Sequence, residues 1–203
     1  MVETSLWMQK VAADPGHSGW YIERFRAMAR AGDDLGGEAR FVDAMAPRGA
    51  HILDAGCGPG RVGGYLAAAG HRVVGVDVDP ALIAAAEQDH PGPRWLVGDL
   101  AELDLPARGV GEPFDVIVSA GNVMTFLAPS TRVPVLSGLR SHLRADGRLA
   151  IGFGAGRDYE FGQFLADAAT AGLAAELLLS AWDVRPFTED SGFLVALLVP
   201  TVP

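Results

Sequence analysis

The hydrophobic pattern changes its period several times along the chain. Short apolar runs of strand length alternate with segments in which apolar residues recur every three or four positions, the spacing of an amphipathic helix. The predicted strands cover residues 51–55, 72–78, 95–100, 114–121 and 148–153, and the predicted helices cover residues 61–69, 81–88, 129–144 and 157–171. Strands that alternate with helices predict a parallel sheet with helices on both faces.

The two ends of the chain extend this pattern. Tyr21, Phe25 and Met28 form a helical stripe within residues 18–31, and residues 38–46 predict a second short helix. Two β-rich stretches, 174–183 and 192–200, are spaced like a terminal antiparallel hairpin. We therefore expect one α/β domain over residues 1–203, with a doubly wound, mostly parallel seven-stranded sheet. Residues 1–48 are its helical cover and 49–203 its Rossmann-like core.

A run of alternating glycines separates the first predicted strand from the first predicted helix. It reads Asp54-Ala55-Gly56-Cys57-Gly58-Pro59-Gly60-Arg61. Glycines without side chains let a ligand lie against the main chain, where free N–H groups and the positive end of the helix dipole point outward. The loop therefore predicts a nucleotide-type site. Asp54 would repel a pyrophosphate but attract an ammonium and a sulfonium group, which favours a cationic adenosyl ligand.

Two further strands also end in an acidic residue. Asp77 ends the second predicted strand, about 20 residues after the glycine loop, where a carboxylate accepts hydrogen bonds from both ribose hydroxyls. Asp99 follows the third strand. Because ligands of an open parallel sheet bind beyond the carboxyl ends of its strands, Asp54, Asp77 and Asp99 are expected in one crevice. For Asp79, next to Pro80, we prefer a role as helix N-cap.

The motif resembles that of a known enzyme class. Asp54, Gly56, Gly58 and Gly60 are similar to the first motif of the class I methyltransferases, which is an apolar strand, an acidic residue and G-x-G-x-G. The resemblance implies the class I methyltransferase fold, S-adenosyl-L-methionine as cofactor and S-adenosyl-L-homocysteine as product. It also implies that Asp99 and the backbone of the following residue lie near adenine. The expected activity is in-line methyl transfer to a small molecule.

Site residues follow from the motifs and the resemblance. The predicted cofactor-binding residues are Asp54, Gly56, Cys57, Gly58, Gly60, Arg61, Asp77, Val78, Gly98, Asp99, Leu100, Ser119, Ala120, Gly121, Tyr21 and Arg24. The last two are included because an N-terminal helix often covers the site in this class, although simple packing onto the domain is the preferred interpretation of that helix. The predicted substrate residues are Trp20, Asn122, Met124, Phe126, Arg157 and Tyr159.

No spacing identifies a catalytic base. His17, Tyr21, Asp158 and Tyr159 are the candidates near the expected site, and transfer from a sulfonium does not require a base. Residues 119–122 lack the Asn/Asp-Pro-Pro-aromatic motif of many N-methylating relatives, so methylation of adenine or glutamine nitrogen loses support.

Two other functions remain open. Gly58, Gly60 and Gly63 spell G-x-G-x-x-G, the fingerprint of NAD(P)-binding oxidoreductases, but this register starts two residues late for a strand that ends at Ala55. A protein that binds S-adenosylmethionine without turning it over, as a sensor or structural module, would show the same cofactor motif.

Composition and charge limit the partners. The 203 residues are 49% hydrophobic and carry a net charge of −9, which disfavours a nucleic-acid substrate. Cys57 is the only cysteine, so an intramolecular disulfide or a cysteine-based zinc site is excluded, and no His and carboxylate cluster suggests a metal. No apolar run approaches the about 18 residues of a membrane helix, so we expect a soluble, cytoplasmic protein. The oligomeric state is left open.

Overall fold

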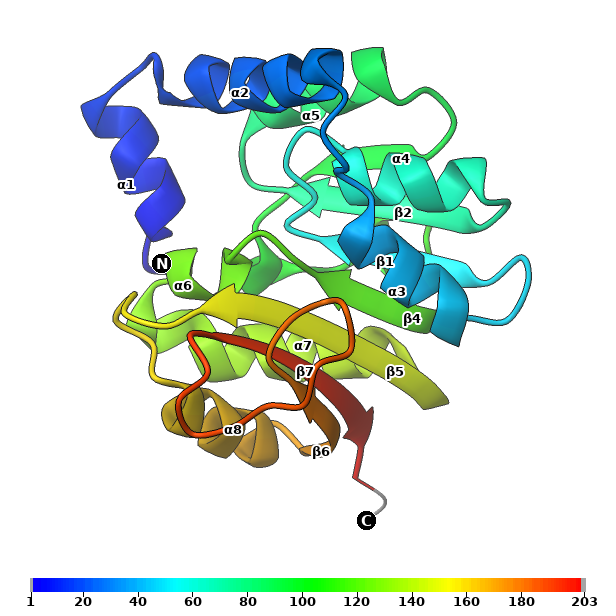
Figure 1. The fold of residues 1–203 in the computed structure, drawn as a ribbon, viewed down its shortest axis with the longest axis vertical. Helices are drawn as coiled ribbons and strands as arrows, with labels where there is room; N and C mark the ends of the chain where they lie inside the picture. The colour runs from blue at the N-terminus through cyan, green and yellow to red at the C-terminus, as the bar shows by residue number, and fades with distance from the viewer. Residues whose placement is uncertain (1, 202–203) are drawn as a thin grey trace.

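The computed structural model describes residues 2–201 and contains a seven-stranded sheet with the strand order β3-β2-β1-β4-β5-β7-β6 (Figure 1). Its strands are β1 (His51–Ala55), β2 (Arg72–Asp77), β3 (Arg94–Val97), β4 (Phe114–Ser119), β5 (Leu143–Gly154), β6 (Leu173–Leu179) and β7 (Phe193–Pro200). Neighbours from β3 to β5 pair in parallel, whereas β7 pairs antiparallel with both β5 and β6. The predicted sheet and its C-terminal antiparallel hairpin are confirmed.

Helices cover both faces of the sheet. They are α1 (Leu6–Ala13), α2 (His17–Ala31), α3 (Gly37–Met45), α4 (Arg61–Ala68), α5 (Pro80–Asp89), α6 (Val123–Phe126), α7 (Arg132–His142) and α8 (Phe161–Thr170). Short 3-10 turns are η1 (Leu100–Glu102), η2 (Pro106–Arg108) and η3 (Pro129–Thr131). Within residues 2–201, none of the helices has the length and apolar character to span a membrane.

Alternating side chains of the central strands divide the core into two layers. On β1, Leu53 and Ala55 pack toward α7 and α8, whereas Ile52 packs toward α3 and α4. All five residues of β1 are buried because helices lie on both faces. The strand order reverses between β1 and β4, which both end at the same edge of the sheet. This is the position at which an open α/β sheet binds its ligand.

Some element boundaries differ from the sequence prediction. Helix α1 has no counterpart among the predicted elements. Between the predicted strands 95–100 and 114–121, where no element was predicted, the structure has η2 and most of η1. Strand β5 begins at Leu143 instead of residue 148. The pairing register shifts between Phe114 and Val116, so residues 144–147 bulge from the ladder. Strand β6 ends at Leu179, four residues earlier than predicted.

Candidate functional site

The glycine loop bends from β1 into α4 at the sheet edge. Gly58 has a φ of 54°, and a Cβ built on it would stand 3.7 Å from the ring of Tyr21, in the space that the loop and α2 enclose. A branched side chain resists this backbone angle. Gly60 serves a different purpose: its Cβ would lie 2.8 Å from Ala86 and 3.0 Å from Trp95, so its small size lets α4 approach α5 and β3.

Two buried carboxylates stand beside this loop. Asp54 is 2% exposed and accepts a hydrogen bond from the Gly63 backbone N–H at 2.8 Å. Asp77 accepts from the Gly58 N–H at 2.8 Å and from the Asp79 N–H at 3.0 Å. Burial raises the pKa of Asp54 to about 7 and the pKa of Asp77 to about 6. A cationic or hydroxyl-bearing ligand would favour the ionised form of both groups.

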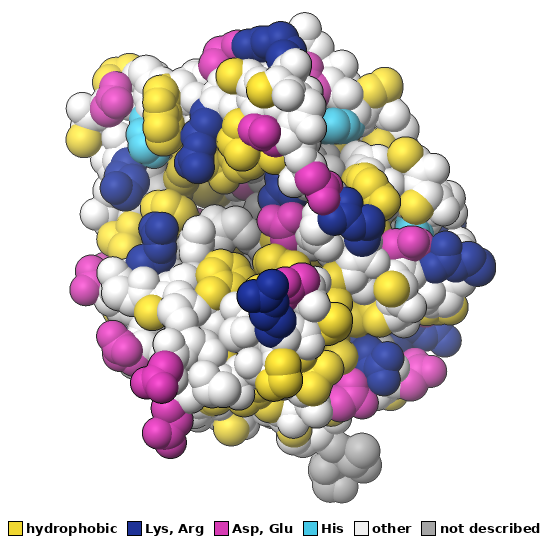
Figure 2. Space-filling view, in the orientation of Figure 1, with side chains coloured by type: hydrophobic (Ala, Val, Ile, Leu, Met, Phe, Trp, Pro, Cys, Tyr) yellow, Lys and Arg dark blue, Asp and Glu magenta, His cyan; other side chains and the backbone are white. Residues whose placement is uncertain are grey.

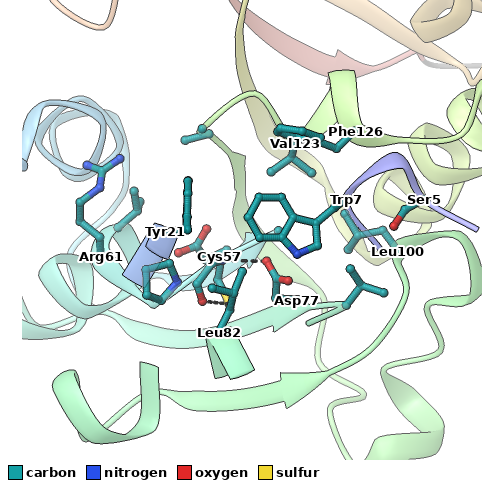
Figure 3. Close-up of a pocket in the computed structure, with 18 of the residues that line it drawn as sticks. Ser5, Trp7, Tyr21, Cys57, Arg61, Asp77, Leu82, Leu100, Val123 and Phe126 are labelled. Carbon is teal, nitrogen blue, oxygen red and sulfur yellow. Dashed lines mark hydrogen bonds between the residues drawn. The ribbon is translucent and has the colours of Figure 1, made fainter. Parts of the chain in front are cut away.

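These carboxylates line an inner cavity of about 100 Å³ (Figure 3). The predicted cofactor residues that line it are Tyr21, Asp54, Gly56, Cys57, Gly58, Arg61, Asp77, Val78, Asp99, Leu100, Ala120 and Gly121. They come from α2, the glycine loop and the carboxyl ends of β2, β3 and β4. Burial also raises the pKa of the Cys57 thiol, so it stays protonated as a small member of the loop.

A second hollow of about 430 Å³ opens from the same wall. It shares Trp7, Tyr21, Phe25, Arg61, Gly121 and Phe126 with the inner cavity. The predicted residues His17, Trp20, Arg24, Asn122, Phe126 and Arg157 line this outer hollow. Figure 2 shows such a hollow in the surface, with Lys and Arg side chains around it and hydrophobic side chains in its walls. The Tyr21, Phe25 and Met28 stripe of α2 thus faces the hollow, instead of serving only to pack the helix.

One buried carboxylate connects two helices of the N-terminal cover to α5. Asp79 accepts hydrogen bonds from Trp7 Nε1 at 2.9 Å and from the Ser18 hydroxyl, and it caps α5 by accepting from the Ala81 N–H at 2.9 Å. The predicted capping role is confirmed, and the same group joins α1, α2 and α5. Trp7 lies in the middle of the close-up, next to Phe126 and above Asp77 (Figure 3).

The structure does not bring every predicted residue to these cavities. Tyr159 is 1% exposed, stacks on Phe153 and donates to Asp167 at 2.8 Å, so it is a core residue and not a substrate contact or a base. Burial also raises the pKa of its phenol above the ordinary value. Met124 is likewise 1% exposed in the core beneath the sheet edge. Both residues follow a predicted strand near the expected site, and this position in the sequence did not distinguish core from pocket.

Three predicted cofactor residues also lie outside the lining. Ser119 is buried and donates its hydroxyl to the Ala55 carbonyl at 2.9 Å, which ties β4 to β1. Gly98 faces the Arg108 side chain, whose nitrogen would lie 2.8 Å from a Cβ. Gly60 packs against α5 as described above. These positions support the shape of the loop ends without facing the cavity.

Several lining residues were missed by the sequence analysis. They are Ser5, Trp7, Pro59, Val62, Leu82, Val123 and Leu127. Ser5 caps α1 by accepting from the Met8 N–H, and a Ser before a helix-forming run was the available signal for this helix. Nothing in the local pattern indicates that α1 folds back over the glycine loop, because this depends on the distant carboxylate of Asp79.

The residues present fit the cofactor implied by the motif. The backbone at Gly58 is open toward the cavity, and Asp77 stands beside it as an acceptor for hydroxyl groups. Asp54, Asp77 and Asp99 together give the inner cavity the negative charge that attracts an ammonium and a sulfonium. The inner cavity and the outer hollow together reach the several hundred Å³ that small-molecule sites occupy.

Comparisons with known proteins agree with this geometry. A family model described as "Methyltransferase domain" matches residues 52–147. A crystal structure of a TehB-like SAM-dependent methyltransferase from Corynebacterium glutamicum is 53% identical and superimposes with a TM-score of 0.87, covering 93% of this chain and 100% of that one.

Curated relatives match over shorter stretches. Malonyl-[acyl-carrier protein] O-methyltransferase of Pectobacterium atrosepticum is 32% identical over 97 residues, which is 48% of this chain and 37% of that protein. An uncharacterized methyltransferase of Synechocystis is 35% identical over 58% of this chain and 56% of its own length. This chain therefore spans roughly a third to a half of the length of these two relatives. The solved relative matches over its full length, and this chain belongs to the class I S-adenosylmethionine-dependent methyltransferases.

Proposed function

We propose that this protein transfers the methyl group of S-adenosylmethionine to a small-molecule acceptor bound in the outer hollow. The observation that carries the proposal is the shared wall between the two cavities: Tyr21, Gly121 and Phe126 line both. An acceptor in the outer hollow would therefore meet a cofactor in the inner cavity. The hollow of about 430 Å³ has the size of a small-molecule site, and the net charge of −9 argues against a nucleic-acid acceptor.

The chain's own residues supply binding, orientation and exclusion of water. S-adenosylmethionine carries a methyl group on a cationic sulfur, so the leaving group is already activated. Asp77 is placed to accept hydrogen bonds from ribose hydroxyls, and Gly58 leaves room for the ligand against the main chain. Trp7 and Phe126 close the cavity with ring centroids 5.5 Å apart. Well-oriented reactants gain on the order of 7 to 11 kcal/mol from proximity alone.

Proton transfer has a limited role in this proposal. Burial raises the pKa of Tyr21, so at neutral pH its phenol is a hydrogen-bond donor at the wall between the cavities and not a base. His17 lines the outer hollow between Trp7 and Trp20, with ring centroids 5.0 and 5.6 Å away. Asp158 lines neither cavity, so His17 is the remaining candidate to take a proton from an acceptor that carries one. Tyr159 is removed from this role by its place in the core.

Calorimetry and turnover test the proposal together. We expect S-adenosylmethionine and S-adenosylhomocysteine to bind with micromolar Kd, and NAD and NADP not to bind. Release of S-adenosylhomocysteine over an acceptor panel then separates an enzyme from a module that only binds the cofactor. Binding of NADP in place of S-adenosylmethionine would contradict the proposal. A cytoplasmic location and a single domain, with residues 1–48 as its cover, stay predictions from the sequence.

A further inference from the structure

Cations without a partner gather at the outer hollow. Lys10, Arg24 and Arg157 line it, and within residues 2–201 these three side chains make no ion pair and no hydrogen bond. Of the other Lys and Arg side chains in this range, all but Arg140 have a carboxylate or carbonyl partner. The sequence has 25 acidic residues and only 16 Lys and Arg residues, so carboxylate partners are plentiful elsewhere on this protein.

The acidic residues of the hollow are already neutralised. Asp34 pairs with Arg40 at 2.6 Å, and Glu38 holds the Arg61 guanidinium through both carboxylate oxygens at 2.6 and 2.8 Å. The three unpaired cations therefore leave the lining of the outer hollow with net positive charge. The inner cavity is the reverse, since three aspartates line it. A ligand that spans both spaces is attracted by its cationic part inward and by its anionic part outward.

The cofactor accounts for only part of this positive charge. It contributes one carboxylate, and Arg24 is the predicted partner for it because Arg24 lies on α2 one turn from Tyr21, whose ring stands over Gly58. Arg157 comes from the segment after β5 and was predicted from the sequence as a substrate residue. Arg157, together with Lys10 from α1, is thus a cation of the outer hollow that the cofactor carboxylate does not need.

The side chain of Asn122 lies near Arg157 and is held in place by a backbone hydrogen bond. Asn122 Oδ1 accepts from the Gly154 backbone N–H at 2.8 Å, which directs the Nδ2 donors of this side chain away from that bond. A Cβ built on Gly154 would lie 3.7 Å from Arg157 Nε and 3.6 Å from Asn122 Oδ1. Asn122 keeps a φ of 68°, and Thr125 holds its carbonyl oxygen through two hydrogen bonds at 2.9 and 2.8 Å. Asn122 and Arg157 both line the outer hollow, so a side-chain amide and a guanidinium face the same space.

We propose that the acceptor is a small organic anion whose carboxylate binds between Arg157 and the side-chain amide of Asn122. Charge-assisted bonds from a guanidinium to a carboxylate are the strong ones among hydrogen bonds. Trp20, Phe25 and Phe126 line the same hollow and accommodate an apolar or aromatic body. This inference rests on the proposed function and adds the chemical class of the acceptor to it.

A matched pair of probes tests this anion site. Benzoate and benzamide share one aromatic body and differ in charge, and each is titrated into the protein saturated with S-adenosylhomocysteine. The readout is the NMR signal of the Asn122 side-chain amide, assigned with Asn122→Asp. We expect benzoate to bind at least about tenfold more tightly than benzamide, which corresponds to about 1.4 kcal/mol. This preference should shrink as salt is raised, because Arg157 is exposed.

Three variants locate the site. Arg157→Gln is expected to weaken benzoate about tenfold while the Kd of S-adenosylhomocysteine, measured by calorimetry, stays within about twofold. Arg24→Gln should weaken the cofactor and leave benzoate unchanged. Arg140→Gln removes an equally unpaired cation that lies against Gly172 and should change neither. Equal binding of benzoate and benzamide, or unchanged benzoate binding in Arg157→Gln, overturns the inference. Failure of S-adenosylhomocysteine to bind the unmodified protein overturns the proposed function first.

Discussion

Replacing Asp77 by Asn should separate folding from cofactor binding. Burial raises the pKa of Asp77 from an ordinary 3.8 to about 6, so the ionised group destabilises the folded protein by roughly 3 kcal/mol. The amide introduced by Asp77→Asn avoids this charge, but it leaves the N–H of Gly58 or Asp79 without its acceptor, at about 1 to 3 kcal/mol. At pH 8 these two effects nearly cancel, and the variant should fold.

The contribution of Asp77 to folding stability should change with pH in a definite direction. Because the folded pKa of Asp77 is raised, its contribution to stability is complete below about pH 4 and is lost as the pH rises through about 6. Linkage then makes the unmodified protein lose about 1 kcal/mol from this group between pH 5 and pH 8, and the variant loses none of it. Denaturant unfolding at both pH values should show the gap between the two proteins shrinking as the pH rises.

Cofactor affinity should respond much more strongly. The variant loses at least one charge-assisted acceptor for the ribose hydroxyls, worth roughly 1.5 to 3 kcal/mol, so the Kd should rise at least about tenfold at pH 8. Isothermal titration with S-adenosylhomocysteine measures this. An unchanged Kd would remove Asp77 from the cofactor site. A stability gap that widens toward pH 8 would refute the assignment of its raised pKa to burial.

Further substitutions probe the loop, the cover and the core. Gly58→Val should abolish measurable cofactor binding with little loss of secondary structure by circular dichroism, because the new side chain enters the cavity at a φ of 54°. Trp7→Ala should cost about 3 to 5 kcal/mol of unfolding free energy in denaturant, since it empties a buried site and removes a donor to Asp79. Tyr159→Phe should cost about 1 kcal/mol through the lost bond to Asp167 and leave kcat unchanged, a result that a catalytic tyrosine would not give.

The cofactor half was predictable because its signals are local. The strand, the glycines and the acidic strand ends lie within a few residues of one another, and backbone geometry alone brings Asp54, Asp77 and Asp99 to one sheet edge. The parallel α/β sheet and the terminal hairpin followed from element type and spacing. A resemblance to a known family then assigned the ligand.

The outer hollow was less predictable because it is assembled from distant segments. Trp7, Asn122 and Arg157 meet there from three parts of the chain, and no periodicity relates them. Tyr159 shows the opposite error: a tyrosine after a glycine-rich exit is equally compatible with a pocket and with a core. The tyrosine ring itself is buried, and Asp167, two turns further on, accepts the hydrogen bond from its hydroxyl, which places Tyr159 in the core.

Because Asp79 accepts hydrogen bonds from Trp7, Ser18 and Ala81, the N-terminal cover and the start of α5 depend on the same carboxylate. Any movement of α1 that widens the cavity must break the bond from Trp7 to this carboxylate, and the carboxylate stays buried with one donor fewer. Such a bond contributes roughly 1.5 to 3 kcal/mol to holding α1 over the cavity, in addition to the packing of Trp7 against Ile22 and Leu82. A substitution at Asp79 would therefore disturb the start of α5 and the cover over the cavity together.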